Sequence, residues 1–202
     1  MTVYELFGSN KEYLKNAKGF IFDFDGTLVD SMPYWDRKAG DRISDYGSFS
    51  EYMAAKYAND IEPKPFAEEI LRFLHENGVP VCIATDTPRA MSEGFFKRHD
   101  FDSITDFYIG CDEIGKNKYE SPDIYFEAAK RMGLSPCECV VAEDYLSSAI
   151  TAKRAGFICV GVFDEESRDD MFELRHICDG YVYNLGKLLP ESGAPASGRM
   201  ND

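Results

Sequence analysis

The sequence predicts an α/β fold, with a doubly wound parallel sheet and a small helical cap inserted after the first strand. From residue 65 onward, apolar runs of strand length alternate with amphipathic helical segments. Continuous apolar strands are typical of parallel sheets that are covered on both faces. Between residues 31 and 63 the apolar side chains recur at helical spacing instead. We therefore expect a Rossmann-like core formed by residues 1–30 and 64–189, interrupted by a cap of residues 31–63.

The first expected strand, residues 20–24, precedes a turn that contains Gly26 and Thr27. The cap should hold two helices, broken near Gly47 and ended by prolines. Residues 190–202 are rich in Pro, Gly, Ser and Ala, which predicts a flexible tail. The remaining elements should be, in order, helix 66–77, strand 79–85, helix 88–99, strand 104–109, helix 122–132, strand 139–142, helix 147–155, strand 157–163, helix 168–176 and a short strand near Tyr181.

Composition narrows the class of protein. The chain has 202 residues, 44% of them hydrophobic, which allows one full-sized domain with an insertion. Its net charge of −14 argues against nucleic acid or an anionic membrane as the main partner. No segment reaches the ~20 apolar residues needed to cross a bilayer, and no signal peptide is evident, so we expect a cytoplasmic protein. The six cysteines are expected to be reduced, and Cys137 and Cys139 lack the partners of a zinc site.

Two carboxylates follow the first strand directly, at Asp23 and Asp25. An unpaired carboxylate costs several kcal/mol to bury, so a metal ion is the simplest way to offset the charge. An ionised carboxylate is already a nucleophile at neutral pH, which suits Asp23 to attack on phosphorus. Asp25 would then protonate the leaving alcohol and later take a proton from water. This arrangement predicts phosphoryl transfer.

The stretch from Asp23 to Thr27, Asp-Phe-Asp-Gly-Thr, resembles the first motif of the haloacid dehalogenase superfamily, in its phosphatase and beta-phosphoglucomutase-like branch. Three later stretches resemble the other motifs in order: strand 81–85 ending in Thr85, Lys118 before Ser-Pro-Asp-Ile-Tyr at 121–125, and strand 140–144 ending in Glu143 and Asp144. The cap is shorter than the four-helix lid common in that family. Either the substrate is bulky or a second subunit completes the enclosure.

The resemblance implies a role for each matched residue. Thr85, with Asp86 in the loop that follows, would bind the phosphoryl oxygens, and Lys118 would neutralise the nucleophile and the phosphate together. Lys116 is the alternative to Lys118, because the spacing to the proline is one residue longer than is usual. Mg²⁺ would be held by Asp23, the backbone carbonyl of Asp25 and Asp144, with Glu143 as a further candidate ligand, since it prefers carboxylates, substrate phosphate and water.

The function expected from these motifs is a Mg²⁺-dependent phosphatase that acts on a small phosphorylated metabolite through an aspartyl-phosphate. A sugar-phosphate mutase is the first alternative, although similar mutases carry a His twelve residues after the nucleophile, where this chain has Trp35. A binding protein on the same fold is the second, because fold alone does not establish activity. We expect a monomer or homodimer, without a nucleic-acid or membrane partner.

Overall fold

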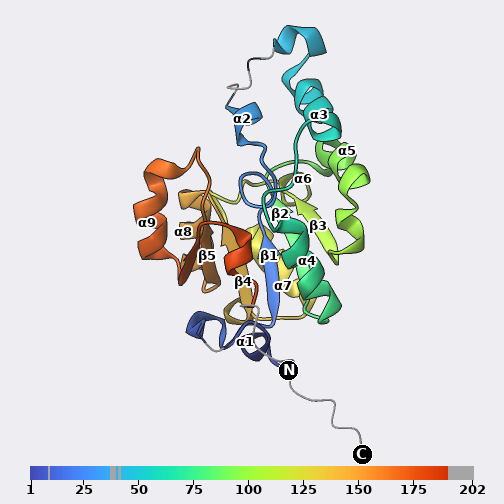
Figure 1. The fold of residues 1–202 in the computed structure, drawn as a ribbon. Helices are drawn as coiled ribbons and strands as arrows, with labels where there is room; N and C mark the ends of the chain where they lie inside the picture. The colour runs from blue at the N-terminus through green and yellow to red at the C-terminus, as the bar shows by residue number, and fades with distance from the viewer. Residues whose placement is uncertain (9, 37–39, 41, 191–202) are drawn as a thin grey trace, which may run out of the picture.

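The computed structural model describes residues 1–8, 10–36, 40 and 42–190, so the predicted tail lies almost wholly outside the described residues. Within the described chain, six parallel strands form one sheet in the order β3-β2-β1-β4-β5-β6. This arrangement confirms the predicted Rossmann-like α/β fold (Figure 1). The strands are β1 (Gly19–Phe22), β2 (Val81–Thr85), β3 (Phe107–Gly110), β4 (Cys139–Glu143), β5 (Ile158–Val162) and β6 (Gly180–Val182).

Strand β1 lies at the centre of the sheet, where the strand order reverses. Phe20 pairs with Val81 of β2 on one side and with Val140 of β4 on the other. In open parallel sheets, ligands bind beyond the carboxyl ends of the strands at such a reversal. The ends of β1, β2 and β4 therefore converge on the place where a ligand site is expected.

Helices cover both faces of the sheet. Successive side chains of each strand point to opposite faces, so each strand contributes to two cores. Phe20 and Phe22 point into a core shared with α4 and α5, whereas Ile21 points into a core shared with α7 and α8. Helix α9 packs beside α8. The helices of the core are α1 (Val3–Leu6), α4 (Ala67–Glu76), α5 (Arg89–His99), α6 (Cys111–Ile114), α7 (Asp123–Met132), α8 (Leu146–Arg154) and α9 (Met171–Ile177).

The expected strand 104–109 is wrong at its beginning, and β3 starts only at Phe107. The preceding residues are used by other hydrogen bonds: the Thr105 hydroxyl donates to the Phe101 carbonyl at 2.9 Å, and the Asp106 carboxylate accepts from the Val81 amide at 2.7 Å. The short helix α6 was not predicted, because four residues between glycines carry too little periodic pattern.

The inserted segment lies above the carboxyl end of β1 (Figure 1) and is called the lid here. Its described residues form α2 (Met32–Trp35), a 3₁₀ turn (Ile43–Tyr46) and α3 (Phe49–Asn59), which is one short turn more than the two helices predicted. Helix α3 packs on α5 of the core. A Cβ added at Gly94 of α5 would lie 2.5 Å from the Cβ of Ala58, so the two helices touch nearly backbone to backbone.

The longest helices in the described part of the chain, α3 and α5, have 11 residues each. None of the described helices combines the length and the apolar character that crossing a membrane requires.

Candidate active site

The carboxylate of Asp23 lies at the centre of the site, directly after β1, and the residue is 4% exposed. Its Oδ1 accepts a hydrogen bond from the Phe24 amide at 2.6 Å and forms an ion pair with the Lys118 ammonium. Burial raises the pKa of the Asp23 carboxyl above its ordinary value, although Lys118 opposes that shift. The strongest partner of this carboxylate is therefore a buried cation.

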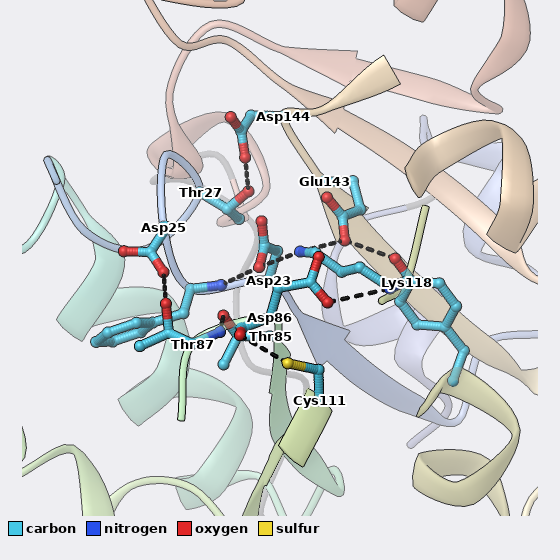
Figure 2. Close-up of polar contacts among 12 residues, drawn as sticks. Asp23, Asp25, Thr27, Thr85, Asp86, Thr87, Cys111, Lys118, Glu143 and Asp144 are labelled. Carbon is cyan, nitrogen blue, oxygen red and sulfur yellow. Dashed lines mark hydrogen bonds and ion pairs between the residues drawn. The ribbon is translucent and has the colours of Figure 1, made fainter. Parts of the chain in front are cut away.

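Lys118 bridges two buried carboxylates, as Figure 2 shows, with its Nζ against Asp23 and 2.9 Å from Oε1 of Glu143. Burial lowers the pKa of the lysine, but the two carboxylates outweigh burial and raise it above its ordinary value. Lys116, the alternative from the sequence, is exposed and pairs with Asp123 at 2.7 Å. The structure thus brings Lys118 to Asp23 and leaves Lys116 at the surface.

Glu143 and Asp144 follow one another at the end of β4 and are both buried. Oε1 of Glu143 also accepts from the Tyr125 hydroxyl at 2.7 Å, whereas its Oε2 is buried without a hydrogen-bond partner among the described residues. Burial, together with the charge of Asp23, raises the pKa of Asp144 to about 8. The same causes raise the pKa of Glu143 well above its ordinary value. The single Lys118 ammonium, which also pairs with Asp23, lowers both pKa values but does not outweigh these effects.

A divalent cation would supply the further positive charge that these carboxylates need in order to be ionised. Asp23, Glu143 and Asp144 each offer a carboxylate oxygen, and these oxygens lie within 4.8 Å of one another. A set of hard oxygen ligands suits Mg²⁺, which is usually held by one or two carboxylates, substrate phosphate and water. The unpaired Oε2 of Glu143 is the observation that most directly favours a ligand here.

The turn after β1 brings the first and fourth motifs together. The Thr27 hydroxyl donates to Oδ1 of Asp144 at 2.8 Å (Figure 2). Gly26 has φ +76°, and a Cβ at that position would lie 2.7 Å from Cγ of Asp144. Only glycine adopts this conformation readily and leaves room for the carboxylate.

The carboxylate of Asp25 points away from the acidic trio and toward the lid. Its Oδ1 accepts from the Ser31 hydroxyl at 2.6 Å, from the Trp35 indole N–H at 3.1 Å, and from the Tyr57 hydroxyl. Its Oδ2 accepts from the Thr87 hydroxyl at 2.6 Å. The acidic trio that could hold a metal therefore does not include the Asp25 side chain.

Thr85 and Asp86 lie at the end of β2, facing Asp23 across the site (Figure 2). The Thr85 hydroxyl accepts from the Thr87 amide at 3.1 Å. The Asp86 carboxylate accepts from the Lys118 amide at 3.0 Å, so this side chain supports the lysine loop. A contact between Asp86 and phosphate would use its backbone N–H, since two anions repel one another.

Sequence reasoning missed Tyr57 and Thr87 as partners of Asp25. Thr87 carried a signal, because it lies two residues after Thr85 in the same strand-end loop. Tyr57 carried none, since its position in α3 matches the spacing of a packing residue. A cavity of about 430 Å³ opens beside these groups and is lined by Asp23, Asp25, Met32, Trp35, Thr85, Asp86, Thr87, Asn117, Lys118, Tyr119, Asp144 and Tyr145.

Comparison with known proteins agrees with this geometry. A family model described as haloacid dehalogenase-like hydrolase matches residues 38–156. The bifunctional riboflavin kinase/FMN phosphatase of Arabidopsis thaliana is 31% identical over 122 residues, which cover 60% of this chain and 32% of that protein. This chain thus spans about a third of that relative's length. Hexitol phosphatase A of Escherichia coli (strain K12) is 27% identical over 183 residues, covering 72% of this chain and 83% of that protein.

Solved structures share the fold. That of a putative beta-phosphoglucomutase from Thermotoga maritima matches with a TM-score of 0.68 and 21% sequence identity, and the match covers 85% of this chain and 96% of that one. A likeness at this level of identity supports the common architecture of sheet and helices.

Proposed function

Because the chain belongs to the haloacid dehalogenase-like hydrolases, we propose that it is a Mg²⁺-dependent phosphatase that works through an aspartyl-phosphate on Asp23. The family and the phosphatases among its relatives make it a phosphoric monoester hydrolase that acts on small phosphorylated substrates. The single observation that carries the finer proposal is the placement of Asp23, which is buried, pairs with Lys118 and lies near the carboxylates of Glu143 and Asp144.

Asp23 is the proposed nucleophile. Its carboxylate attacks the phosphorus of the bound monoester, the bond from phosphorus to the alcohol oxygen breaks, and an acyl phosphate forms on Asp23. Lys118 pairs with the carboxylate and Thr85 lines the same cavity, so both can hold the phosphoryl oxygens as charge develops. A donor that is already in place stabilises that charge without reorganisation.

Asp25 is the proposed proton carrier. It gives a proton to the leaving alcohol oxygen in the first step, and in the second it takes one from the water that opens the acyl phosphate. Its hydrogen bond to Thr87 keeps one carboxyl oxygen beside the strand end that holds Thr85. Trp35 and Tyr57 of the lid donate to the other oxygen and so fix the carboxyl group in the cavity lining.

Asp23, Glu143 and Asp144 are the residues that would hold Mg²⁺. When bound, the ion supplies positive charge that lowers the pKa of these carboxyls and neutralises the transferring phosphoryl group. The protein's own contribution is a dry, preformed trio of oxygens, with Tyr125 and Lys118 fixing Glu143 and Thr27 fixing Asp144.

The test is phosphate release from a generic aryl phosphate. Purified protein with Mg²⁺ should release phosphate, and both EDTA and Asp23→Asn should abolish the release. Rapid acid quenching of the wild type with a ³²P-labelled donor should trap label on the protein that alkali removes. A protein that binds the phosphate ester but never turns it over would contradict the proposal and favour a binding role.

Transfer to a second sugar hydroxyl, as in a mutase, has less support. Trp35 occupies the position at which similar mutases carry a His, and its indole N–H can only donate a hydrogen bond. A side chain that cannot accept a proton does not help a second hydroxyl attack the aspartyl-phosphate. Isomerisation of a hexose phosphate without net release of phosphate would favour the mutase instead.

A further inference from the structure

Two tyrosines stand at the mouth of the active-site cavity, and each directly follows a residue of the site. Tyr119 comes after Lys118 and Tyr145 comes after Asp144, and both line the cavity. Their side chains are nevertheless exposed to solvent, at 45% for Tyr119 and 47% for Tyr145. A large aromatic ring left half in water beside a reactive centre is available to a ligand.

Both rings are carried by anchored backbone. The Tyr119 carbonyl accepts from the Thr151 hydroxyl at 3.2 Å. The Tyr119 hydroxyl accepts from the side-chain amide of Asn117 at 2.8 Å. Tyr145 caps the N-terminus of α8, where its carbonyl accepts from the Ala149 amide at 3.0 Å. Because the backbone and one ring are already fixed, a ligand that stacks here loses less conformational entropy on binding.

The lid also contributes side chains to the lining of this cavity. Met32 and Trp35 of α2 line the same cavity, and the Trp35 ring is held by its N–H bonds to Asp25 and to the Tyr57 hydroxyl, the latter at 3.1 Å. A thioether, an indole and two phenol rings thus line one cavity. The cavity of about 430 Å³ falls within the usual size of small-molecule sites.

The charge of the cavity limits what the leaving group can carry. Among the described residues that line it, Lys118 is the single cation, and its ammonium is already shared by Asp23 and Glu143. The lining also includes the carboxylates of Asp25, Asp86 and Asp144. A second phosphate or a carboxylate on the substrate would meet these anions, and the described part of the lining offers it no further cation.

We propose that the substrate is a monophosphate ester of an uncharged alcohol that bears a planar ring, of about the size of a nucleoside monophosphate, with the ring held by Tyr119 and Tyr145. This assignment rests on the proposed phosphatase function and names the substrate class of the same site. The phosphoryl group occupies the inner end, beside Asp23 and Lys118. The ring reaches the mouth, where stacking on an aromatic side chain favours any base or flavin-like plane.

The experiment compares two matched pairs of substrates in the presence of Mg²⁺. Adenosine monophosphate and ribose 5-phosphate share the reacting ester, but only the first has a ring beyond the sugar. Glycerol 3-phosphate and 3-phosphoglycerate differ in a carboxylate. We expect kcat/KM to be about tenfold or more higher for adenosine monophosphate than for ribose 5-phosphate. It should also be about tenfold higher for glycerol 3-phosphate, which has no carboxylate, than for 3-phosphoglycerate.

Variants assign the ring preference to the tyrosines. Tyr119→Ala and Tyr145→Ala should each lower the ratio of the two kcat/KM values several-fold, whereas Tyr119→Phe and Tyr145→Phe keep the ring and should preserve it. Phe172→Ala is the matched control, because Phe172 is 67% exposed but lies on α9, outside the cavity lining.

Failure of this inference differs from failure of the phosphatase proposal. No release of phosphate from the aryl phosphate or from any of the four esters would overturn the proposed function, whereas turnover of the aryl phosphate alone would overturn only the substrate class. Equal turnover of adenosine monophosphate and ribose 5-phosphate, or a ring preference that survives both alanine variants, would overturn the substrate class alone. Faster turnover of 3-phosphoglycerate than of glycerol 3-phosphate would do the same.

Discussion

The hydroxyl of Tyr57 donates a hydrogen bond to Oδ1 of Asp25, so a lid side chain directly contacts the carboxyl group proposed as the proton carrier. The Tyr57 ring stacks on Phe24 with the ring centroids 5.8 Å apart, and this packing holds the hydroxyl in place. The lid therefore contributes to the reacting constellation as well as covering it.

Tyr57→Phe should lower kcat in a way that depends on the leaving group. The variant keeps the stacking on Phe24 but removes one hydrogen bond that holds Asp25 in position. Proton transfer from a misplaced Asp25 is slower, and this affects a poor leaving group most. We expect about a tenfold loss with alkyl phosphates and little loss with a nitrophenyl phosphate, whose oxygen needs no proton to leave. Steady-state rates across esters of graded alcohol pKa measure this dependence.

Tyr46→Phe, which also removes a phenol hydroxyl from the lid, is the control and should behave as wild type. A uniform loss for all esters would mean that Tyr57 supports the fold and not the position of Asp25.

Lys118→Met should nearly abolish activity and destabilise the protein at neutral pH. It leaves Asp23 and Glu143 buried without their shared cation, a change that typically costs about 3–5 kcal/mol. Acid should reduce this cost, because both carboxyls can then be protonated. Urea unfolding at two pH values and phosphatase assays provide the measurements.

Lys116→Met is the matched control, since Lys116 forms only an exposed pair with Asp123. It should change the unfolding free energy by no more than about 0.5 kcal/mol. A larger loss of activity in Lys116→Met than in Lys118→Met would reverse the assignment of the motif lysine.

Stability without metal should fall as the pH rises. The pKa of Asp144 is raised to about 8 in the folded protein, from an ordinary value of 3.8, and that of Glu143 is raised as well. Between the two values the folded state binds more protons than the unfolded state, so the unfolding free energy decreases with pH by up to about 1.4 kcal/mol per unit and per group.

Mg²⁺ should reverse this trend, because it binds the ionised carboxylates of the folded state. Thermal unfolding with EDTA or with Mg²⁺ at pH 5 and pH 8 should show a stabilisation by the ion that is larger at the higher pH. Asp144→Asn should raise stability at pH 8 in EDTA and weaken the effect of Mg²⁺. A stabilisation by Mg²⁺ that does not change with pH would contradict this account of the trio.

Gly94→Ala should destabilise the protein by about 1–3 kcal/mol, because the new methyl group would overlap Ala58 where α5 meets the lid helix. Chemical denaturation measures the loss. The double variant with Ala58→Gly should recover part of it, since one of the two overlapping methyl groups is then gone. If the two substitutions were strictly additive, the helices would not touch at this point.

The fold and the centre of the site followed from local sequence. Apolar strands that end in Asp23, Thr85 and Glu143 must present those residues at one edge of a parallel sheet, and the structure has them there. Their roles in catalysis and metal binding stay predictions. The surroundings of Asp25 did not follow, because the direction of Tyr57 depends on how α3 crosses α5. Strand pattern is local, whereas a helix crossing is set by contacts distant in sequence.

The exact ends of helices and strands could not be predicted from the local sequence pattern either. Residues 104–106 have strand-like composition, but Thr105 and Asp106 find hydrogen-bond partners in the preceding turn and in β2. The choice between Lys116 and Lys118 required coordinates, because both lie in one loop and only packing decides which ammonium is buried.

The near backbone contact between Gly94 and Ala58 bears on how molecules enter and leave. A lid helix seated this closely on the core has little room to swing, so passage through the mouth would not wait for a large rigid-body rotation. The value of kcat should then respond only weakly to added viscogens such as sucrose. The rate-limiting step would be the chemical step at phosphorus.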